Sequence, residues 1–131
     1  MNVMRDYKNH CYFVKEKIHN QTFVLKFEEY ERMLVCITFN VVLGVYNKRK
    51  HATLNENNVI LTGEHPFETV RKTIRAFKLL EEEIADLPCL KKKITVNWTD
   101  NKRRDVYAKY LLKHGYVFDK CDGTKCLTKT I

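Results

Sequence analysis

Hydrophobic and polar positions alternate along the first third of the chain. Residues 11–19 and 22–30 are two runs rich in aromatic and β-branched residues, and Asn20-Gln21 separates them. In the second run the apolar residues Phe23, Leu25 and Phe27 occupy alternate positions. Alternation of this kind predicts strands with one buried face, and the short polar separator predicts a hairpin. The polar residues 29–32 are expected to interrupt the strand pattern after the second run.

Residues 33–46 are the most apolar segment and predict a long central strand. One parity carries Val35, Ile37, Phe39, Val41, Leu43 and Val45. The other parity is mixed, with Cys36, Thr38, Asn40, Val42 and Gly44. Such a strand is covered on at least one face. Gly44 predicts a bulge within it, in preference to a close contact with a ligand.

The hydrophobic period changes after residue 65. Residues 59–61 predict a short strand that ends at Thr62-Gly63, after a polar connection. From Pro66 the apolar residues recur every three or four positions, which predicts an amphipathic helix of about 20 residues that Pro88 closes. The members of this stripe are Phe67, Val70, Ile74, Phe77, Ile84 and Leu87.

The last third predicts a strand, a second helix and a hairpin. Residues 94–98 form the strand, and a helix starts at Thr99 or Asp100 and ends at Gly115. Residues 116–129 form a hairpin around Asp122-Gly123. Residues 1–10 are expected to be disordered or an edge segment. The order β-β-β-β-α-β-α-β-β predicts an α/β fold, a mixed antiparallel and parallel sheet with helices on both faces.

Composition narrows the class of protein. The chain has 131 residues, 44% hydrophobic and 31% charged, which is enough for one folded core and too little for two. No apolar run reaches the roughly 18 residues of a membrane helix, and the first ten residues lack the apolar core of a signal peptide. Five cysteines, an odd number, favour a reducing compartment without disulfides. We therefore expect a single cytoplasmic domain, residues 1–131, that contacts no membrane.

Cys121 and Cys126 allow one alternative, a zinc site. Histidines that could complete it are His10, His51 and His114. Zinc needs four converging ligands, usually in two close pairs, whereas these cysteines are four residues apart around a turn. With four residues between them, Cys121 and Cys126 are more typical of ordinary strand-facing cysteines, and no metal is expected.

The second half of the chain resembles the C-terminal half of GNAT-type N-acetyltransferases. In that family a strand leads to a helix that starts near Asn, carries a tyrosine and ends with Gly and an aromatic residue. The similar positions here are residues 94–98, Asp100-Asn101, Tyr107 or Tyr110, and Gly115-Tyr116. Small GNAT-like proteins of bacteriophages also show a Thr-Gly-x-x-x-Phe-x-Thr-Val opening, similar to Thr62-Gly63 through Val70. The resemblance spans roughly residues 33–131 and implies acetyl transfer from acetyl-CoA to an amine on a small molecule or protein, in the host cytoplasm if the protein is phage-encoded.

The resemblance also implies a cofactor site. GNAT enzymes hold the pyrophosphate of acetyl-CoA on backbone N–H groups of a Gly-rich turn before the long helix. The corresponding residues here are Leu61, Thr62, Gly63, Phe67, Arg71, Lys72 and, on the second helix, Asn101. The turn departs from the motif, because one glycine remains, Pro66 removes a donor and Glu64 and Glu68 add negative charge. Arg71 and Lys72 would compensate in part.

Acyl transfer needs an acid for the leaving thiolate and a base for the attacking amine. Tyr107 or Tyr110 is the candidate acid, although the family's tyrosine position, four residues before Gly115, holds Leu111. Glu64 or His65 is the candidate base, directly or through a water. The tyrosines equally suit packing on the sheet, and His65 suits an exposed helix start. An enzyme should show a cleft between parted strands at residues 59–62 and 94–98.

The excess of basic residues supports a function of a different class. Lys and Arg number 24 against 16 Asp and Glu, a net charge of +8. Basic clusters stand at residues 48–51, 91–93 and 102–104. If two of them converge, they form a surface that neutralises phosphates. The alternative is therefore a catalytically inactive GNAT-like protein that binds a host protein or nucleic acid.

Overall fold

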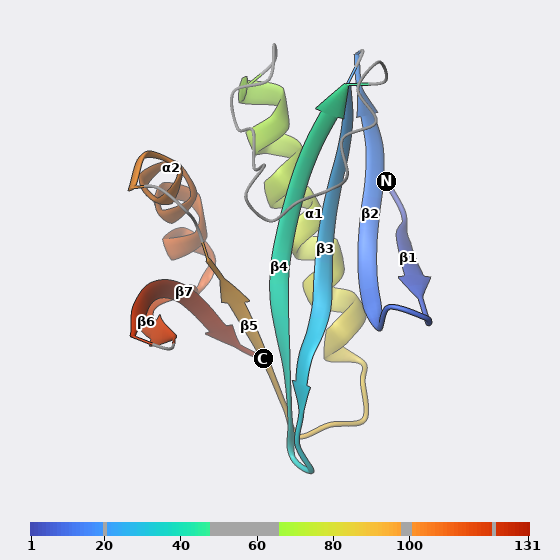
Figure 1. The fold of residues 1–131 in the computed structure, drawn as a ribbon, viewed down its shortest axis with the longest axis vertical. Helices are drawn as coiled ribbons and strands as arrows, with labels where there is room; N and C mark the ends of the chain where they lie inside the picture. Colours follow the sequence, from blue (N-terminus) through green and yellow to red (C-terminus); the bar gives the residue numbers. More distant parts are fainter. Residues whose placement is uncertain (20, 48–65, 98–100, 122) are drawn as a thin grey trace.

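The structure is a computed structural model that describes residues 1–19, 21–47, 66–97, 101–121 and 123–131. Within these residues it is a mixed α/β fold with one seven-stranded sheet and two α-helices (Figure 1). The strands are β1 (Val3–Asp6), β2 (Cys11–Ile18), β3 (Gln21–Arg32), β4 (Cys36–Asn47), β5 (Lys91–Val96), β6 (Val117–Cys121) and β7 (Thr124–Thr130). The helices are α1 (Pro66–Ala85), α2 (Asn101–Leu111) and a 3-10 turn, η1 (Leu112–His114).

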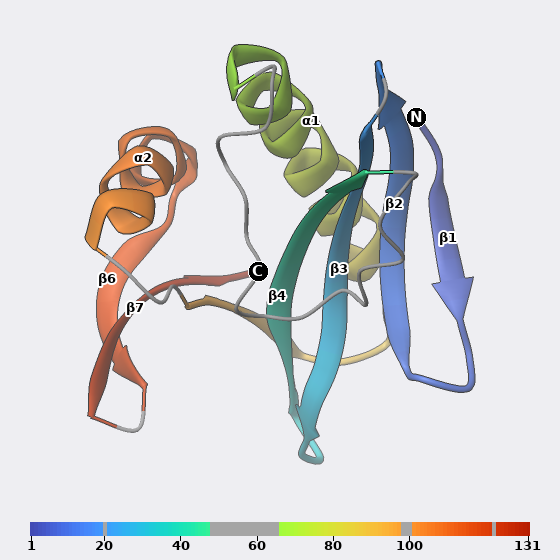
Figure 2. The same cartoon turned by 45° about the horizontal axis from the view of Figure 1, so that its top comes forward.

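The strands lie in the order β1-β2-β3-β4-β5-β7-β6. Strands β1 to β4 form an antiparallel meander, and β5, β7 and β6 form a second antiparallel group. The two groups meet at β4 and β5, which run parallel over five residue pairs from Cys36↔Lys91 to Asn40↔Thr95. Figure 2 shows α1 running behind the meander and α2 at the end of the sheet that carries β6 and β7.

The core lies between the helices and one face of the sheet. Alternate residues of β3 and β4 face α1, and the rings of Phe27 and Phe77 meet edge to face with centroids 5.7 Å apart. The cluster joins Phe23, Leu25, Phe27, Ile37, Phe39, Leu43, Ala76, Phe77, Leu80, Ile84, Ile94, Tyr107, Ala108, Leu111, Tyr116 and Leu127, among others. Because both helices contribute to this one cluster, the described residues give no support to the predicted helix on each face.

Most of the predicted elements are confirmed. The hairpin of β2 and β3, the central strand β4, the helix that begins at Pro66 and the final hairpin all appear within a few residues of the predicted bounds. Gly115 ends the 3-10 turn η1 that follows α2, with φ 90°, and Gly123 lies in the last turn with φ 80°, a backbone region that favours glycine. Of the two expectations for residues 1–10, the edge segment is confirmed, because β1 pairs with β2.

Two predictions about the central strands are wrong. Residues 29–32 do not end the strand, because β3 continues to Arg32 and stays paired with β4. The bulge is not at Gly44, which lies opposite Val24 in regular register, but in β3 between Glu29 and Glu31. The predicted strand at residues 59–61 lies outside the described residues.

The expectation of a chain without disulfides is also wrong. Cys121 and Cys126 form a disulfide with their Cα atoms 6.1 Å apart, while Cys11, Cys36 and Cys89 are free thiols. In the hairpin register Cys121 lies opposite Thr124 and Cys126 lies opposite Asp119, so the two cysteines are diagonal neighbours on one face. Diagonal positions of a hairpin fall within the Cα separation that a disulfide requires. An odd cysteine count therefore did not predict this local pairing.

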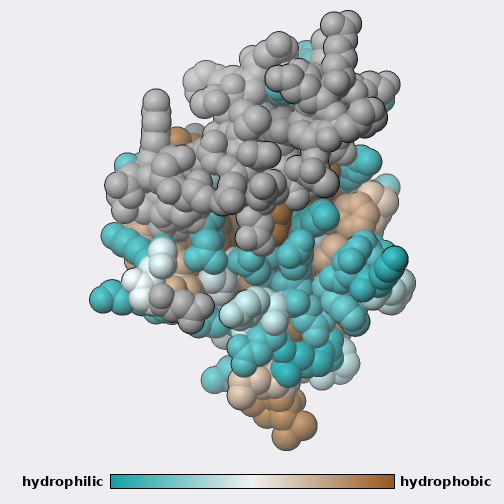
Figure 3. All heavy atoms as spheres, in the orientation of Figure 1, coloured by the Kyte–Doolittle hydropathy of each residue, from teal (hydrophilic) through white to brown (hydrophobic). Residues whose placement is uncertain are grey.

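Figure 3 shows the side of the meander opposite α1. Hydrophilic residues dominate it below the grey atoms, and an apolar group projects at the lower end, where the turn between β3 and β4 lies. That turn carries Met33, Leu34 and Val35, and Leu34 is 100% exposed. The apolar tip is therefore no part of the core.

Candidate functional site

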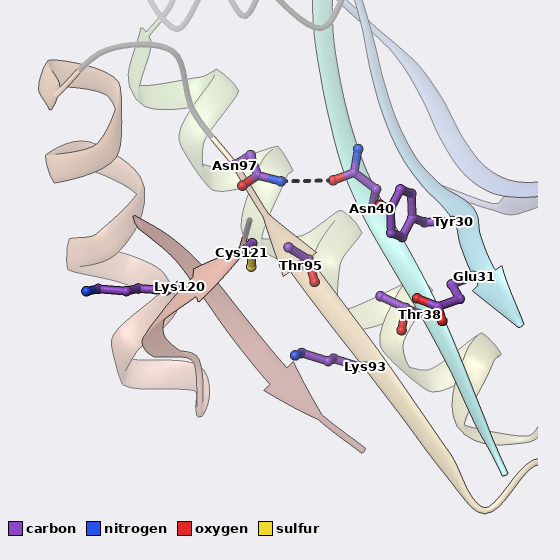
Figure 4. A pocket seen from close by; sticks show the side chains of 9 residues that line it. All are labelled: Tyr30, Glu31, Thr38, Asn40, Lys93, Thr95, Asn97, Lys120 and Cys121. Carbon is purple, nitrogen blue, oxygen red and sulfur yellow. Dashed lines mark hydrogen bonds between the residues drawn. The ribbon is translucent and has the colours of Figure 1, made fainter. Parts of the chain in front are cut away.

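A cavity lies over the end of the parallel ladder between β4 and β5. Asn40 and Thr95 are the last pair of the parallel ladder; beyond them β4 continues beside β3, whereas β5 ends at Val96 beside β7. The cavity has a volume of about 380 Å³ and opens on the side of the sheet opposite α1 (Figure 4). Its lining is almost entirely polar: Tyr30, Glu31, Thr38, Asn40, Lys93, Thr95, Asn97, Lys120 and Cys121.

Alternation along the two central strands supplies the middle of this lining. On β4 the core residues Ile37 and Phe39 alternate with Thr38 and Asn40. The same alternation along β5 places Thr95 in the lining between the core residues Ile94 and Val96, and Asn97 follows directly after the strand. Each strand thus presents a Thr-x-Asn pair to the cavity. The side-chain amide Nδ2 of Asn97 donates to Oδ1 of Asn40 at 3.3 Å, and Figure 4 shows this bond crossing the gap between the strands.

The bulge in β3 supplies Tyr30 and Glu31. Glu29 pairs with Phe39 and Glu31 pairs with Thr38, so Tyr30 is an extra residue. In regular register Tyr30 would lie opposite Thr38 and Glu31 opposite Ile37, so Glu31 would face the core, because successive strand residues point to opposite faces. Glu29 is held by Arg32, whose Nε donates to Oε1 at 2.6 Å and whose Nη2 donates to Oε2 at 3.2 Å. This hydrogen bonding lowers the pKa of the Glu29 carboxyl and ties the two sides of the bulge together.

The charged groups at the cavity are those of Glu31 and Lys93, because Figure 4 shows the side chain of the third charged lining residue, Lys120, pointing away from the others. Lys93 Nζ lies 3.8 Å from Oδ2 of Asp119, a long ion pair between partly exposed groups. Asp119 has other donors, since its Oδ1 accepts from the Lys120 N–H at 2.7 Å and its Oδ2 accepts from the Thr128 hydroxyl at 3.4 Å. Asp119 is therefore positioned largely without Lys93, whose ammonium is available to a ligand.

The predicted catalytic tyrosines do not line this cavity. Tyr107 is 9% exposed and belongs to the core cluster, as the packing interpretation expected. Tyr110 is half-buried, with the Lys109 ammonium 6.0 Å from the centroid of its ring. The predicted bases Glu64 and His65 lie outside the described residues, so no cluster of the predicted acid and base can be assembled from the described part.

The predicted cofactor residues are placed only in part. Leu61, Thr62 and Gly63 lie outside the described residues, and Phe67 and Asn101 lie in the first turns of α1 and α2. Arg71 is exposed on α1.

Lys72, the other basic residue predicted to compensate for the missing glycines, is paired with a carboxylate of the same chain. Lys72 Nζ donates to Oε1 of Glu16 on β2 at 2.8 Å, and this bond lowers the pKa of the Glu16 carboxyl. Glu68, in the first turn of α1, has its Oε2 3.1 Å from Nε2 of His19. Lys72 is thus engaged within the fold.

Tyr116 fixes the hairpin that carries the cavity's outer wall. Its hydroxyl donates to Oε1 of Glu81 on α1 at 2.6 Å, and Lys129 Nζ donates to Oε2 of the same carboxylate at 2.9 Å. Tyr116 is 1% exposed, and burial raises the pKa of its hydroxyl, which stays protonated as a donor. The Gly115-Tyr116 pair singled out in the sequence therefore anchors β6 and β7 to α1.

Several residues that line the cavity were not among the predicted site residues, although the sequence pattern pointed to some of them. The polar residues on one parity of an otherwise apolar strand, Thr38 and Asn40, were noted as a mixed face. The repetition of Thr-x-Asn at Thr95 and Asn97 is the signal that could have joined them. Tyr30 and Glu31 had no such signal, because their position depends on the bulge.

Comparisons with protein-family models, with curated proteins and with solved structures found no match. Within the described ranges no group of three or more His, Cys, Asp or Glu residues could hold a metal ion. In the same part of the chain neither helix has the length and apolar character that crossing a bilayer requires.

Proposed function

We propose that the chain is a GNAT-like N-acyltransferase that moves an acetyl group from acetyl-CoA to an amine. The observation that carries this proposal is the parallel pair β4 and β5, which stops pairing after Asn40 and Thr95 beside a polar cavity. The resemblance of the sequence to GNAT enzymes implies such a parting of two strands. That parting was expected between residues 94–98 and residues 59–62, which lie outside the described part. In the described part the strand parallel to β5 is β4.

Parted strands suit an extended substrate. Beyond Asn40 the edge of β4 no longer has β5 as a ladder partner, and backbone N–H and C=O groups on such an edge bind an extended chain as an added strand would. The arm of acetyl-CoA carries amide groups that fit this edge. For the pyrophosphate the described residues offer less, since Lys72 is paired with Glu16 and Glu68 lies in the first turn of α1.

The cavity suits the acceptor. An amine entering beside Asn40 and Asn97 would meet the thioester carbonyl at the parting of the strands. Its N–C bond forms as the C–S bond breaks, the amine releases a proton and the thiolate takes one up. The Glu31 carboxylate and the Tyr30 phenol line the cavity and join Tyr110 and the predicted base residues as candidates for these proton transfers.

One observation favours the alternative, an inactive binding protein: a GNAT-like pyrophosphate site needs donors, and Lys72 is held by Glu16. The basic cluster at residues 91–93 gives that alternative little support. Lys92 is only 7% exposed, and its Nζ donates to the Ala85 carbonyl at 3.0 Å, at the C-terminal end of α1. A buried lysine that caps a helix offers no charge to nucleic acid.

Titration calorimetry and thermal unfolding with acetyl-CoA test the proposal. A ligand at a hundred times its dissociation constant stabilises the native state by about 2.7 kcal/mol, so acetyl-CoA should raise the melting temperature. Asn97→Trp, a change at an exposed side chain, should block the parted strands and abolish the shift. Lys17→Trp, at an exposed position of β2, is the matched control and should keep it.

Turnover is measured as release of the CoA thiol in the presence of a mixture of amines. Folding of each variant is checked by circular dichroism. A folded wild-type protein that shows neither heat nor a melting shift with millimolar acetyl-CoA would refute the acyltransferase proposal and leave the binding protein.

A further inference from the structure

We infer that the cavity beside β4 and β5 binds a small amine that also carries a carboxylate or phosphate group. As the acceptor of acyl transfer this ligand rests on the proposed function, but its binding does not. The inference comes from the charges that the sheet places in one row and from the size of the cavity.

One row of the sheet brings opposite charges to the same face. Glu31 on β3 lies opposite Thr38 on β4, and Thr38 lies opposite Lys93 on β5. Neighbouring strands are about 4.8 Å apart, so the backbone positions of Glu31 and Lys93 are separated by about 10 Å with a hydroxyl between them. Figure 4 shows Glu31 and Thr38 beside each other and Lys93 on the adjoining strand. A carboxylate at one end and an ammonium at the other match a ligand with an ammonium and an anionic group.

The anion-binding end has one ammonium, that of Lys93. Lys120 also lines the cavity, but Figure 4 shows its side chain pointing away from Lys93 and Thr95. The 3.8 Å pair between Lys93 and Asp119 is partly exposed, and pairs of this kind contribute about 1 kcal/mol or less. Since Asp119 keeps the Lys120 N–H and the Thr128 hydroxyl as donors, an incoming anion can take over Lys93 without leaving Asp119 unsatisfied. A dication such as a polyamine would place its second positive charge beside Lys93 instead.

The middle of the cavity can recognise a polar body. Thr38, Asn40, Thr95 and Asn97 supply two hydroxyls and two amides, groups that can both donate and accept hydrogen bonds. A volume of about 380 Å³ is at the small end of ligand sites, which span about 300 to 1,000 Å³. An amino acid or an amino-sugar phosphate matches this size and polarity, whereas a lipid chain does not.

Calorimetry without acetyl-CoA tests binding by itself. The probes are matched pairs: β-alanine and O-phosphoethanolamine against ethanolamine, and glucosamine 6-phosphate against glucosamine, with putrescine as the dication. At least one anionic amine should bind at least tenfold more tightly than its neutral partner, and putrescine should bind least. If no anionic amine exceeds its neutral partner, or if putrescine binds best, the inference is overturned.

Three variants separate Lys93 from general charge. Lys93→Met should weaken the anionic amine about tenfold, and Asp119→Asn, which removes the competing carboxylate, should strengthen it severalfold. Lys17→Met, at an exposed lysine of β2, lowers the net charge equally and should change nothing. Equal weakening by Lys93→Met and Lys17→Met would show only long-range attraction and would refute the site.

The transfer assay then distinguishes the two proposals. Selective binding of an anionic amine without acetyl-CoA binding would leave the ligand site standing and refute the acyltransferase. Acetyl transfer that prefers the neutral amines would leave the acyltransferase standing and refute the ligand class.

Discussion

Removing one hydroxyl, in Tyr116→Phe, should measurably destabilise the protein. The hydroxyl of Tyr116 donates to Glu81 at 2.6 Å in a site where the tyrosine is 1% exposed. The change keeps the aromatic ring, whose centroid lies 5.8 Å from that of Phe77, so packing is retained and only the hydrogen bond is lost. The loss is therefore a direct measure of the bond between α1 and the start of β6.

The size of the effect follows from the charge of the acceptor. A hydrogen bond to a charged group contributes about 1.5–3 kcal/mol. Glu81 keeps Lys129 at 2.9 Å in the variant, so its carboxylate stays paired and the middle of that range applies. We expect a loss of about 2 kcal/mol, which for a chain of this length lowers the melting temperature by about 6–10 °C.

Urea unfolding followed by circular dichroism gives the free energy. Tyr7→Phe is the control, because Tyr7 is 78% exposed, and it should change the free energy by less than about 0.5 kcal/mol. A double-mutant cycle with Glu81→Gln should give a coupling of about 1 kcal/mol or more. A loss below about 0.5 kcal/mol for Tyr116→Phe, or additive single effects, would refute the reasoning.

Three further predictions concern acid, thiols and the apolar tip. Hydrogen bonds from Lys72 and Arg32 hold the carboxyl pKa values of Glu16 and Glu29 below the usual 4.5. The two ionised carboxylates therefore stabilise the fold above that pH, and this stabilisation is lost as the pH falls through their folded pKa values. The urea midpoint should be lower at about pH 3 than at about pH 6, and Glu16→Gln should narrow the difference. Alkylation of the unfolded, unreduced protein should modify three cysteines by mass spectrometry, and all five after reduction, because Cys121 and Cys126 are joined; five adducts before reduction would contradict the disulfide. Leu34→Ser, at a fully exposed side chain, should leave the free energy of unfolding within about 0.5 kcal/mol of the wild type, and a larger loss would show that the tip is packed.

Local patterns were enough to predict the elements that bury one continuous face. Phe23, Leu25 and Phe27 alternate along β3, and the α1 stripe from residue 66 has the helical period, so each element reveals its buried side without knowledge of its neighbours. Gly115 and Gly123 were recognised for the same reason, since the left-handed backbone that they adopt is a local demand.

The cavity could not be predicted in this way, because it depends on register. One extra residue, Tyr30, decides whether Glu31 faces the core or the cavity, and that extra residue exists only relative to β4. The pairing of Lys93 with Thr38 likewise depends on the register between β5 and β4. The cysteine pair was misjudged because a count across the chain cannot show that Cys121 and Cys126 are diagonal neighbours in one hairpin.

The short parallel ladder has a consequence for how the molecule assembles and opens. Strands β1 to β4 pair with their neighbours in sequence, as do β6 and β7, whereas β4 meets β5 only after α1 has been traversed. Closing a long loop before any contact is gained makes such pairing late in folding. We expect this seam of five residue pairs to exchange its amide hydrogens sooner than the meander does. The seam beside the polar cavity is therefore expected to be the last part of the sheet to close.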